Sequence, residues 1–169
     1  YEGTTFKSGI QHVLNTGEMI SGSAVGDLAV RANAGNMLFA AGGSVERMRI
    51  TSGGNVGIGT TAPDSILHVH SSSPTITVSN SDTSIIDGQV IGQVDFKSFD
   101  GSTNMTNVFG SIRTEAEGTL DNGVNDGGKM VFSTFKQSTT LVDQMVIDRD
   151  GNVGIGETSP TSKLEVRGS

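Results

Sequence analysis

Two histidines in this chain have the type and spacing to bind a metal ion. His68 and His70 are one residue apart, so in a strand their imidazoles would share a face. Around a threefold axis, such pairs would gather six imidazoles, which are good ligands for transition-metal ions. In a second copy of the same segment Glu165 and Arg167 take their places, which favours plain surface histidines. We therefore predict no metal site and name His68 and His70 as the residues that would form one.

Acidic residues at one position suggest calcium binding. The run Asp148-x-Asp150-x-Asn152 resembles the start of a calcium-binding loop. Such a loop needs Gly at its sixth position and Glu at its twelfth, where this chain has Val153 and Ser159. Because Asp and Asn are also common turn residues, we interpret this run as a hairpin turn.

Paired carboxylates would be needed to cleave a polysaccharide. Glu115 and Glu117 alternate on one expected strand face, and Asp121 and Asp126 lie in the loop that follows. Glycosidases use two carboxyl groups as acid and base or nucleophile, usually in a groove with aromatic side chains. This chain has no Trp and a single Tyr. We interpret these acids as solvated surface charges and expect no catalytic residue and no enzyme activity.

A glycine pattern in the chain matches the dinucleotide-binding fingerprint in form only. Gly57-x-Gly59-x-x-Ala62 has the right spacing, but that site requires a helix that begins at the second glycine. Here Pro63 and a strand-like segment follow, and the second copy has Pro160 at the matching place. We expect a turn and a strand, and no cofactor.

The composition is too thin for an ordinary globular core. Apolar residues make up 34% of the 169 residues and aromatic residues 5%, whereas Gly contributes 24 residues. A lone chain of this kind would offset its conformational entropy poorly. Charged residues are only 17% and Pro is scarce, so composition does not favour disorder. We therefore expect a chain that shares its core with partner copies.

Charge and patterning exclude several classes of partner. The net charge of −7 argues against a nucleic-acid surface. No apolar run approaches the length of a membrane span, and with no cysteine there is no disulfide or thiolate site. The chain starts at Tyr1 without Met and stops at Ser169 just after a strand-like segment. We expect both ends to be cuts through a longer polypeptide.

One stretch of the sequence occurs twice. Residues 48–69 read MRITSGGNVGIGTTAPDSILHV, and residues 145–166, which start 97 positions later, read MVIDRDGNVGIGETSPTSKLEV. The copies align without a gap and are identical at thirteen of 22 positions. Val56-Gly57-Ile58-Gly59 alternates branched apolar side chains with none, so one face of this strand can pack while another backbone approaches the other face.

The rest of the chain alternates apolar and polar residues with turn signals between, which predicts strands and no helix. We expect residues 26–32 and 37–40 to form a hairpin. Further strands are predicted at 45–50, 56–59, 66–69, 75–78, 92–97, 109–114 and 129–135. Connecting loops are predicted at 100–107, 117–128 and 136–140. The fold class is therefore all-β.

The repeated run, with a strand of the type Gly-x-(Met/Leu)-x-Phe before it, resembles the shaft repeats of tailed-bacteriophage tail fibres. The resemblance implies an elongated, interleaved parallel homotrimer of short strands and hairpins. In this family a self-cleaving intramolecular chaperone domain often follows such segments, and none is recognisable in this sequence. Residues 1–69 would form one shaft unit, 70–166 a second with longer loops, and 167–169 the start of a further segment. The trimer core would contain Val56, Ile58, Leu67, Val69, Val153, Ile155, Leu164 and Val166.

The function that the resemblance implies is structural: a segment of a viral tail fibre, in the virion and outside the host cell, that extends or presents host-receptor binding. Its partners would be two further copies, other fibre or tail proteins, and a host surface glycan. A non-viral extracellular fibre or adhesin segment and a polysaccharide-cleaving tailspike are the alternatives. Loops between shaft strands project outward, so the receptor-facing residues would be Asp100, Asn104, Asn107, Asp121, Asn122, Asn125 and Asp126.

Overall fold

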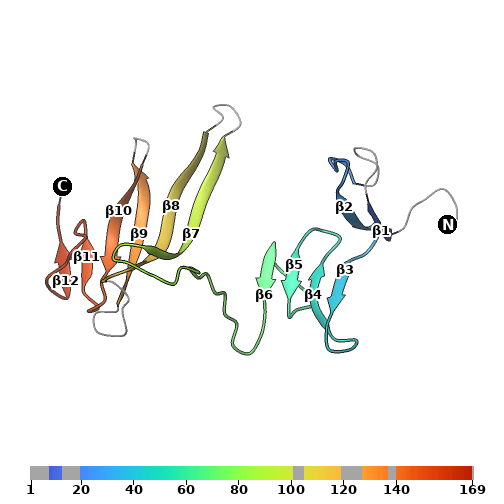
Figure 1. The fold of residues 1–169 in the computed structure, drawn as a ribbon, viewed down its shortest axis with the longest axis horizontal. Coiled ribbons are helices and arrows are strands. Elements are labelled where there is room, and N and C mark those ends of the chain that lie inside the picture. Colours follow the sequence, from blue (N-terminus) through green and yellow to red (C-terminus); the bar gives the residue numbers. More distant parts are fainter. Residues whose placement is uncertain (1–7, 13–19, 101–104, 119–126, 137–139, 169) are drawn as a thin grey trace. The chain divides into compact units, whose positions relative to one another are not determined.

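The computed structural model describes residues 8–12, 20–100, 105–118, 127–136 and 140–168. Within these ranges the chain is all-β, as predicted, with no helix (Figure 1). The strands are β1 (Ser8–His12), β2 (Leu28–Ala32), β3 (Met37–Ala40), β4 (Glu46–Ile50), β5 (Val56–Ile58), β6 (Leu67–Val69), β7 (Val90–Asp100), β8 (Met105–Ala116), β9 (Gly128–Lys136), β10 (Thr140–Ile147), β11 (Val153–Ile155) and β12 (Leu164–Val166).

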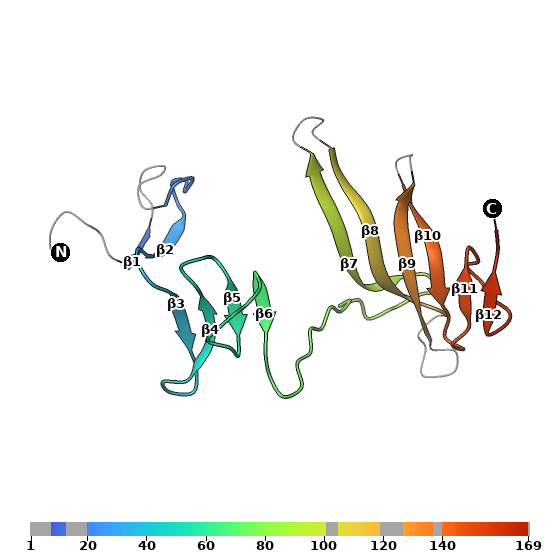
Figure 2. The same ribbon diagram turned by 180° about the vertical axis from the view of Figure 1, so that it is seen from behind.

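The chain divides into two compact units, Tyr1–Ile76 and Thr77–Ser169. The first unit contains the pair β1-β2 and a four-stranded sheet in the order β3-β4-β5-β6. The second contains one six-stranded sheet in the order β12-β11-β10-β9-β8-β7, whose strands lie side by side in both views (Figures 1 and 2). Each four- or six-stranded sheet therefore ends in one copy of the sequence repeat.

The two copies of the repeat fold into the same three-stranded module. β4 pairs with β5 antiparallel, and β5 pairs with β6 parallel. β10, β11 and β12 repeat this arrangement in the second unit. The registers are equivalent as well: Met48 faces Ile58 in the first module, and Met145 faces Ile155 in the second. The predicted duplication is thus a duplication of structure.

A tight hairpin turn joins the first two strands of each module. In the first copy the Gly54 amide donates to the Thr51 carbonyl at 2.9 Å, and in the second the Gly151 amide donates to the Asp148 carbonyl at 3.0 Å. Both glycines have positive φ, 90° and 73°, which L-residues with a side chain adopt at a cost. Such a turn closed by a left-handed residue is a common hairpin connection.

A short connection returns the chain from the end of β5 to the start of parallel β6, and another from β11 to β12. Each connection passes over the central glycine of the preceding strand. A Cβ atom on Gly57 would lie 2.7 Å from the Thr60 carbonyl oxygen, and one on Gly154 would lie 2.1 Å from that of Glu157. The predicted close approach of a backbone to this face is confirmed, and the backbone belongs to the same chain.

Each sheet therefore has two unlike faces. We call the face that carries Gly57 or Gly154, and over which the connection passes, the crossover face. We call the opposite face the apolar face, because strand pairing aligns large apolar side chains there in rows that run across the strands. In the first unit these rows are Phe39–Met48–Ile58–Val69 and Met37–Ile50–Val56–Leu67. In the second unit one row runs across all six strands as Val94–Ile112–Phe132–Met145–Ile155–Val166.

Burial in the second unit follows the crossover face. Val131 and Val146, at 0% and 2% exposure, are the largest fully buried side chains of the described chain. Ser111, Glu115 and Ser133 on the same face are also buried. The side chains of the apolar face, by contrast, are exposed or half-buried in the single chain.

The hairpin predicted for residues 26–40 is wrong. β2 pairs with β1, and β3 turns back through Gly42 and Gly43, both with positive φ, to pair with β4. In β2 the larger apolar side chains face outward in the single chain, since Leu28 is 71% and Val30 42% exposed whereas Ala29 is 4% exposed. The double-glycine turn gives β3 a nearer partner than β2, which the alternation of apolar residues could not reveal.

Two other predicted boundaries are corrected. Residues 75–78 form no strand; instead the Val78 carbonyl packs against β7, where a Cβ on Gly92 would lie 2.8 Å from its oxygen. The predicted loop 100–107 is shorter, because Asp100 ends β7 and Asn107 pairs with Ser98 inside β8. For the loops predicted at 117–128 and 136–140, the flanking strands end and begin close to the predicted bounds, and residues 119–126 and 137–139 lie outside the described ranges.

We predict that Gly154→Ala destabilises the chain by about 1–3 kcal/mol, because a Cβ atom there overlaps the Glu157 carbonyl and the connection must move. Urea unfolding at fixed protein concentration measures the loss. Gly53→Ala is the matched control in the first module, since its Cβ would meet nothing nearer than 3.8 Å. Equal stability of the two variants would contradict the account of the crossover.

Candidate functional site

The eight residues predicted for a trimer core all lie on the apolar faces. Ile58 and Val69 share one row of the first unit, and Val56 and Leu67 share the other. Val153, Ile155, Leu164 and Val166 hold the equivalent places in the second unit. Within the single chain five of these positions are exposed, with Leu67 at 55% and Leu164 and Val166 above 60%, and the other three, Val56, Val69 and Val153, are half-buried. Their burial between copies of the chain concerns an assembly and stays a prediction.

The crossover face of the second unit carries a charged cluster centred on Arg113 of β8. Arg113 Nε donates to Glu115 Oε1 at 2.5 Å, and Nη2 donates to Asp143 Oδ2 at 2.9 Å. Nη1 donates to the hydroxyl of Ser133, which in turn donates to Asp143 Oδ1 at 2.7 Å. Lys129 Nζ lies 3.1 Å from Glu115 Oε2. Two cations and two anions thus neutralise one another across three strands.

The register of the sheet explains how residues thirty positions apart meet. Ser111, Ser133 and Asp143 are direct neighbours in one row across β8, β9 and β10. Arg113 is two residues from Ser111 and therefore on the same face. Partial burial lowers the pKa of Arg113, but hydrogen bonds to Glu115 and Asp143 outweigh that effect and raise its pKa above the ordinary value. The guanidinium therefore remains charged in place.

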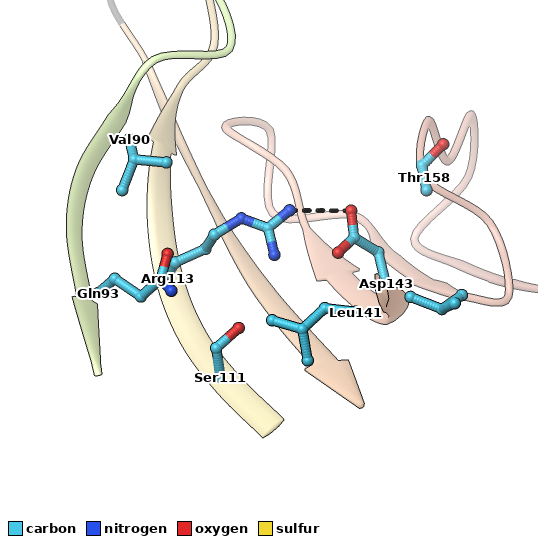
Figure 3. A pocket seen from close by; sticks show the side chains of 8 residues that line it. Val90, Gln93, Ser111, Arg113, Leu141, Asp143 and Thr158 are labelled. Carbon is cyan, nitrogen blue, oxygen red and sulfur yellow. Dashed lines mark hydrogen bonds and ion pairs between the residues drawn. The ribbon is translucent and has the colours of Figure 1, made fainter. Parts of the chain in front are cut away.

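Beside this cluster the surface is hollowed. The hollow has a volume of about 580 Å³ and lies within the second unit. Figure 3 shows Arg113 and Asp143 pointing toward one another. Thr158 of the β11–β12 connection is drawn beyond Asp143, on the side away from Arg113. The hydroxyl oxygen of Ser111 is buried and has no hydrogen-bond partner in the described part of the chain. The lining residues are Val90, Gln93, Ser111, Arg113, Leu141, Val142, Asp143 and Thr158.

An aromatic pair adjoins the hollow on the same face. The rings of Phe109 and Phe135 lie 5.7 Å apart between centroids. Phe135 is the register partner of Leu141, which lines the hollow. Phe109 is 54% exposed. The hollow, whose walls are partly polar and partly apolar, thus borders an aromatic pair with one exposed ring.

The carboxylates considered for catalysis are occupied by structural contacts where the structure describes them. Glu115 is held by Arg113 and Lys129. Glu117 lies beyond the end of β8, and its Oε2 accepts a hydrogen bond from the Arg149 amide at 2.8 Å. Asp121 and Asp126 lie outside the described residues. Both described candidates, Glu115 and Glu117, are thus engaged in contacts within the chain.

His68 and His70 lie near each other in the single chain. Their rings are 5.8 Å apart in an edge-to-face arrangement. Nδ1 of His68 lies 3.1 Å from Asp64 Oδ1 at ion-pair distance, but it lacks the geometry of a hydrogen bond. In the described part of the chain no three His, Cys, Asp or Glu side chains gather as metal ligands.

The acidic run after β10 acts as a turn. Asp148 Oδ1 accepts hydrogen bonds from the amides of Asn152 at 2.7 Å and Asp150 at 2.9 Å, while Oδ2 accepts from the Asn152 side chain at 3.0 Å. Desolvation raises the pKa of Asp148, but these bonds and the charge of Lys163 together lower it below the usual value. Thr51 takes this place in the first module, and its hydroxyl accepts from the Asn55 amide at 3.0 Å.

Most of the predicted receptor-facing residues lie outside the described ranges, namely Asn104, Asp121, Asn122, Asn125 and Asp126. Asp100 and Asn107 belong to strands and not to a loop. The charged cluster and its hollow were not predicted. The only sequence signal for them is the run of polar residues at alternate positions of β8, Ser111, Arg113 and Glu115.

Comparison of the sequence with protein-family models gives no match, and comparison with curated proteins gives no significant match. Among the described residues, no helix has the length and apolar character to cross a membrane.

Glu115→Gln should weaken the charged cluster, because the neutral amide binds Arg113 and Lys129 less strongly than the carboxylate does. We expect a loss of roughly 1.5 kcal/mol or more, typical of hydrogen bonds to charged groups, in urea unfolding. Lys97→Gln removes an ion pair that is 3.6 Å long and whose lysine is 60% exposed, and it should cost about 0.5 kcal/mol or less. A loss no larger in Glu115→Gln would contradict the role of the cluster.

The lowered pKa of Asp148 makes the second module sensitive to acid. A carboxyl group with a depressed folded-state pKa contributes stability above its unfolded pKa of about 4, and this is lost as the pH falls through the folded pKa. We therefore expect the free energy of unfolding to fall below about pH 4, and to fall less steeply in Asp148→Asn. Parallel pH slopes for the two proteins would exclude this contribution.

Proposed function

We propose that this chain is a structural segment of a trimeric extracellular fibre, of the bacteriophage tail-fibre type, that extends or presents a receptor-binding part. The observation that carries the proposal is the apolar face of each unit. It is continuous across the strands, and its side chains are exposed or half-buried in the single chain. Monomeric proteins rarely expose contiguous apolar patches of this kind, which mark sites of association.

The direction of burial supports association through this face. In the second unit the small and polar side chains of the crossover face are buried, while Ile112 and Met130 remain about 40% exposed on the opposite face. Covering the apolar face with copies of the chain would supply the core that the composition lacks. The glycines at positions 57 and 154 keep the connection off that face, so it remains free for packing.

The repeated module supports a shaft. Two modules with equivalent strand pairing are typical of a repeat architecture, in which each unit adds length. The stoichiometry of three and the role in a virion come from the sequence resemblance. Closing the exposed sheet edges within an assembly would also remove a hazard of edge-to-edge aggregation.

The mass of the assembly in solution tests the proposal. Sedimentation equilibrium should give three times the 17.5 kDa mass of the chain. Ile155→Asp, which buries an unpaired charge in the shared core, should weaken association on the order of 100-fold or more. Ile86→Asp is the matched control, since Ile86 is also exposed, at 58%, but lies outside the strands. A compact monomer for the unmodified chain would refute the proposal.

The same shaft would serve a non-viral extracellular fibre or adhesin. The sequence that adjoins the segment in the full polypeptide distinguishes the two. A chaperone or tail-attachment domain supports the phage fibre, whereas an autotransporter or cell-wall anchor supports the adhesin. Glu115 and Glu117 give no support to a polysaccharide-cleaving tailspike, because both are engaged in structural contacts.

A further inference from the structure

We infer that the hollow beside Arg113 and Asp143 is a binding site for a neutral sugar residue of a surface glycan. The inference rests on the proposed function in one respect, namely that an extracellular fibre meets such glycans. The hollow itself belongs to one unit and needs no second chain. It is also distinct from the loops between strands that the sequence favours for receptor contact.

The size and place of the hollow suit one sugar ring. Its volume of about 580 Å³ falls within the range of about 300–1,000 Å³ found for small-molecule sites. It lies on the crossover face, whereas the proposed contact between copies uses the apolar face. A trimer formed through the apolar face would therefore leave this site accessible.

The electrostatics favour a neutral ligand with many hydroxyl groups. Arg113 and Lys129 are balanced by Glu115 and Asp143, so the site lacks the net positive charge that would attract a phosphate or sulfate. The guanidinium uses Nε, Nη1 and Nη2 for one contact each. Since a guanidinium carries five N–H groups, one donor on each terminal nitrogen remains for a ligand.

Acceptors and donors both line the hollow, which matches the dual character of a hydroxyl group. Each Asp143 oxygen accepts a single hydrogen bond from the cluster and, as a carboxylate oxygen, retains a second lone pair. Gln93 and Thr158 add side chains that both donate and accept. The buried Ser111 hydroxyl has no hydrogen-bond partner in the described chain. It could bind a ligand only if a neighbouring side chain of the hollow moved aside.

The apolar surface of a sugar ring also has a counterpart. Leu141 and Val90 line the hollow, and the Phe109–Phe135 pair adjoins Leu141. Binding sites of this type combine apolar and aromatic walls with a few polar groups that fix orientation. Because the hollow is shallow, we expect weak binding for one sugar, which three copies on one fibre would strengthen through multivalency.

Saturation-transfer NMR on the full chain tests the site with the methyl glycosides of glucose, galactose and N-acetylglucosamine at millimolar concentration. We expect transfer to at least one glycoside. Thr158→Trp, which fills the hollow and leaves every residue of the charged cluster unsubstituted, should abolish it, and Phe109→Ala should reduce it several-fold. Thr61→Trp is the matched control, because Thr61 is the equivalent residue of the first module, and it should leave the transfer unchanged.

Three results would overturn the inference: no transfer to any of the glycosides, equal transfer in Thr158→Trp, or displacement of the sugar by inorganic phosphate, which would mark an anion site. Sedimentation of the same samples separates this outcome from the fate of the proposed function. A trimer without sugar binding removes the site and leaves the fibre. A monomer that binds sugar, with loss in Thr158→Trp, removes the fibre and supports the site.

Discussion

The short return between two parallel strands is the constraint on which both sheets depend. Parallel neighbours normally need a crossover of about a dozen residues or more, whereas residues 59–66 and 156–163 make it here. A connection this short must lie flat on the sheet, so the strand beneath it can carry no side chain at the point of contact. Gly57 and Gly154 meet that demand. At these glycines the chain itself covers the crossover face, whereas no connection passes over the apolar face there.

The closed face and the open face divide the side chains in an unusual way. A soluble sheet usually turns its apolar side inward, but the second unit buries Ser111, Ser133 and Glu115 and leaves its row of apolar side chains exposed or half-buried. The buried polar groups are tolerable because Arg113 and Lys129 satisfy most of them. The low apolar content of the chain is thus concentrated on the surface where a partner copy would contribute the missing half of a core.

The sequence predicted the parts of this fold that depend on local pattern. Period-2 alternation and the 97-residue duplication gave the strands and the equivalence of the modules, and the Gly-x-Gly alternation gave the close backbone approach at Gly57. Pairing between β1 and β2 was missed, because partner choice depends on turns such as Gly42-Gly43. The Arg113–Asp143 contact was missed because it joins residues that only the register of three strands brings together.

The two modules are held by equivalent hydrogen bonds within each copy. The Val56 amide donates to the Ile66 carbonyl in the first module, and the Val153 amide donates to the Lys163 carbonyl in the second. The second module is joined to the strands before it through the pairing of β9 with β10. In a fibre of the proposed kind, recombination that preserves this pairing would exchange the strands between the modules and leave the modules themselves unchanged.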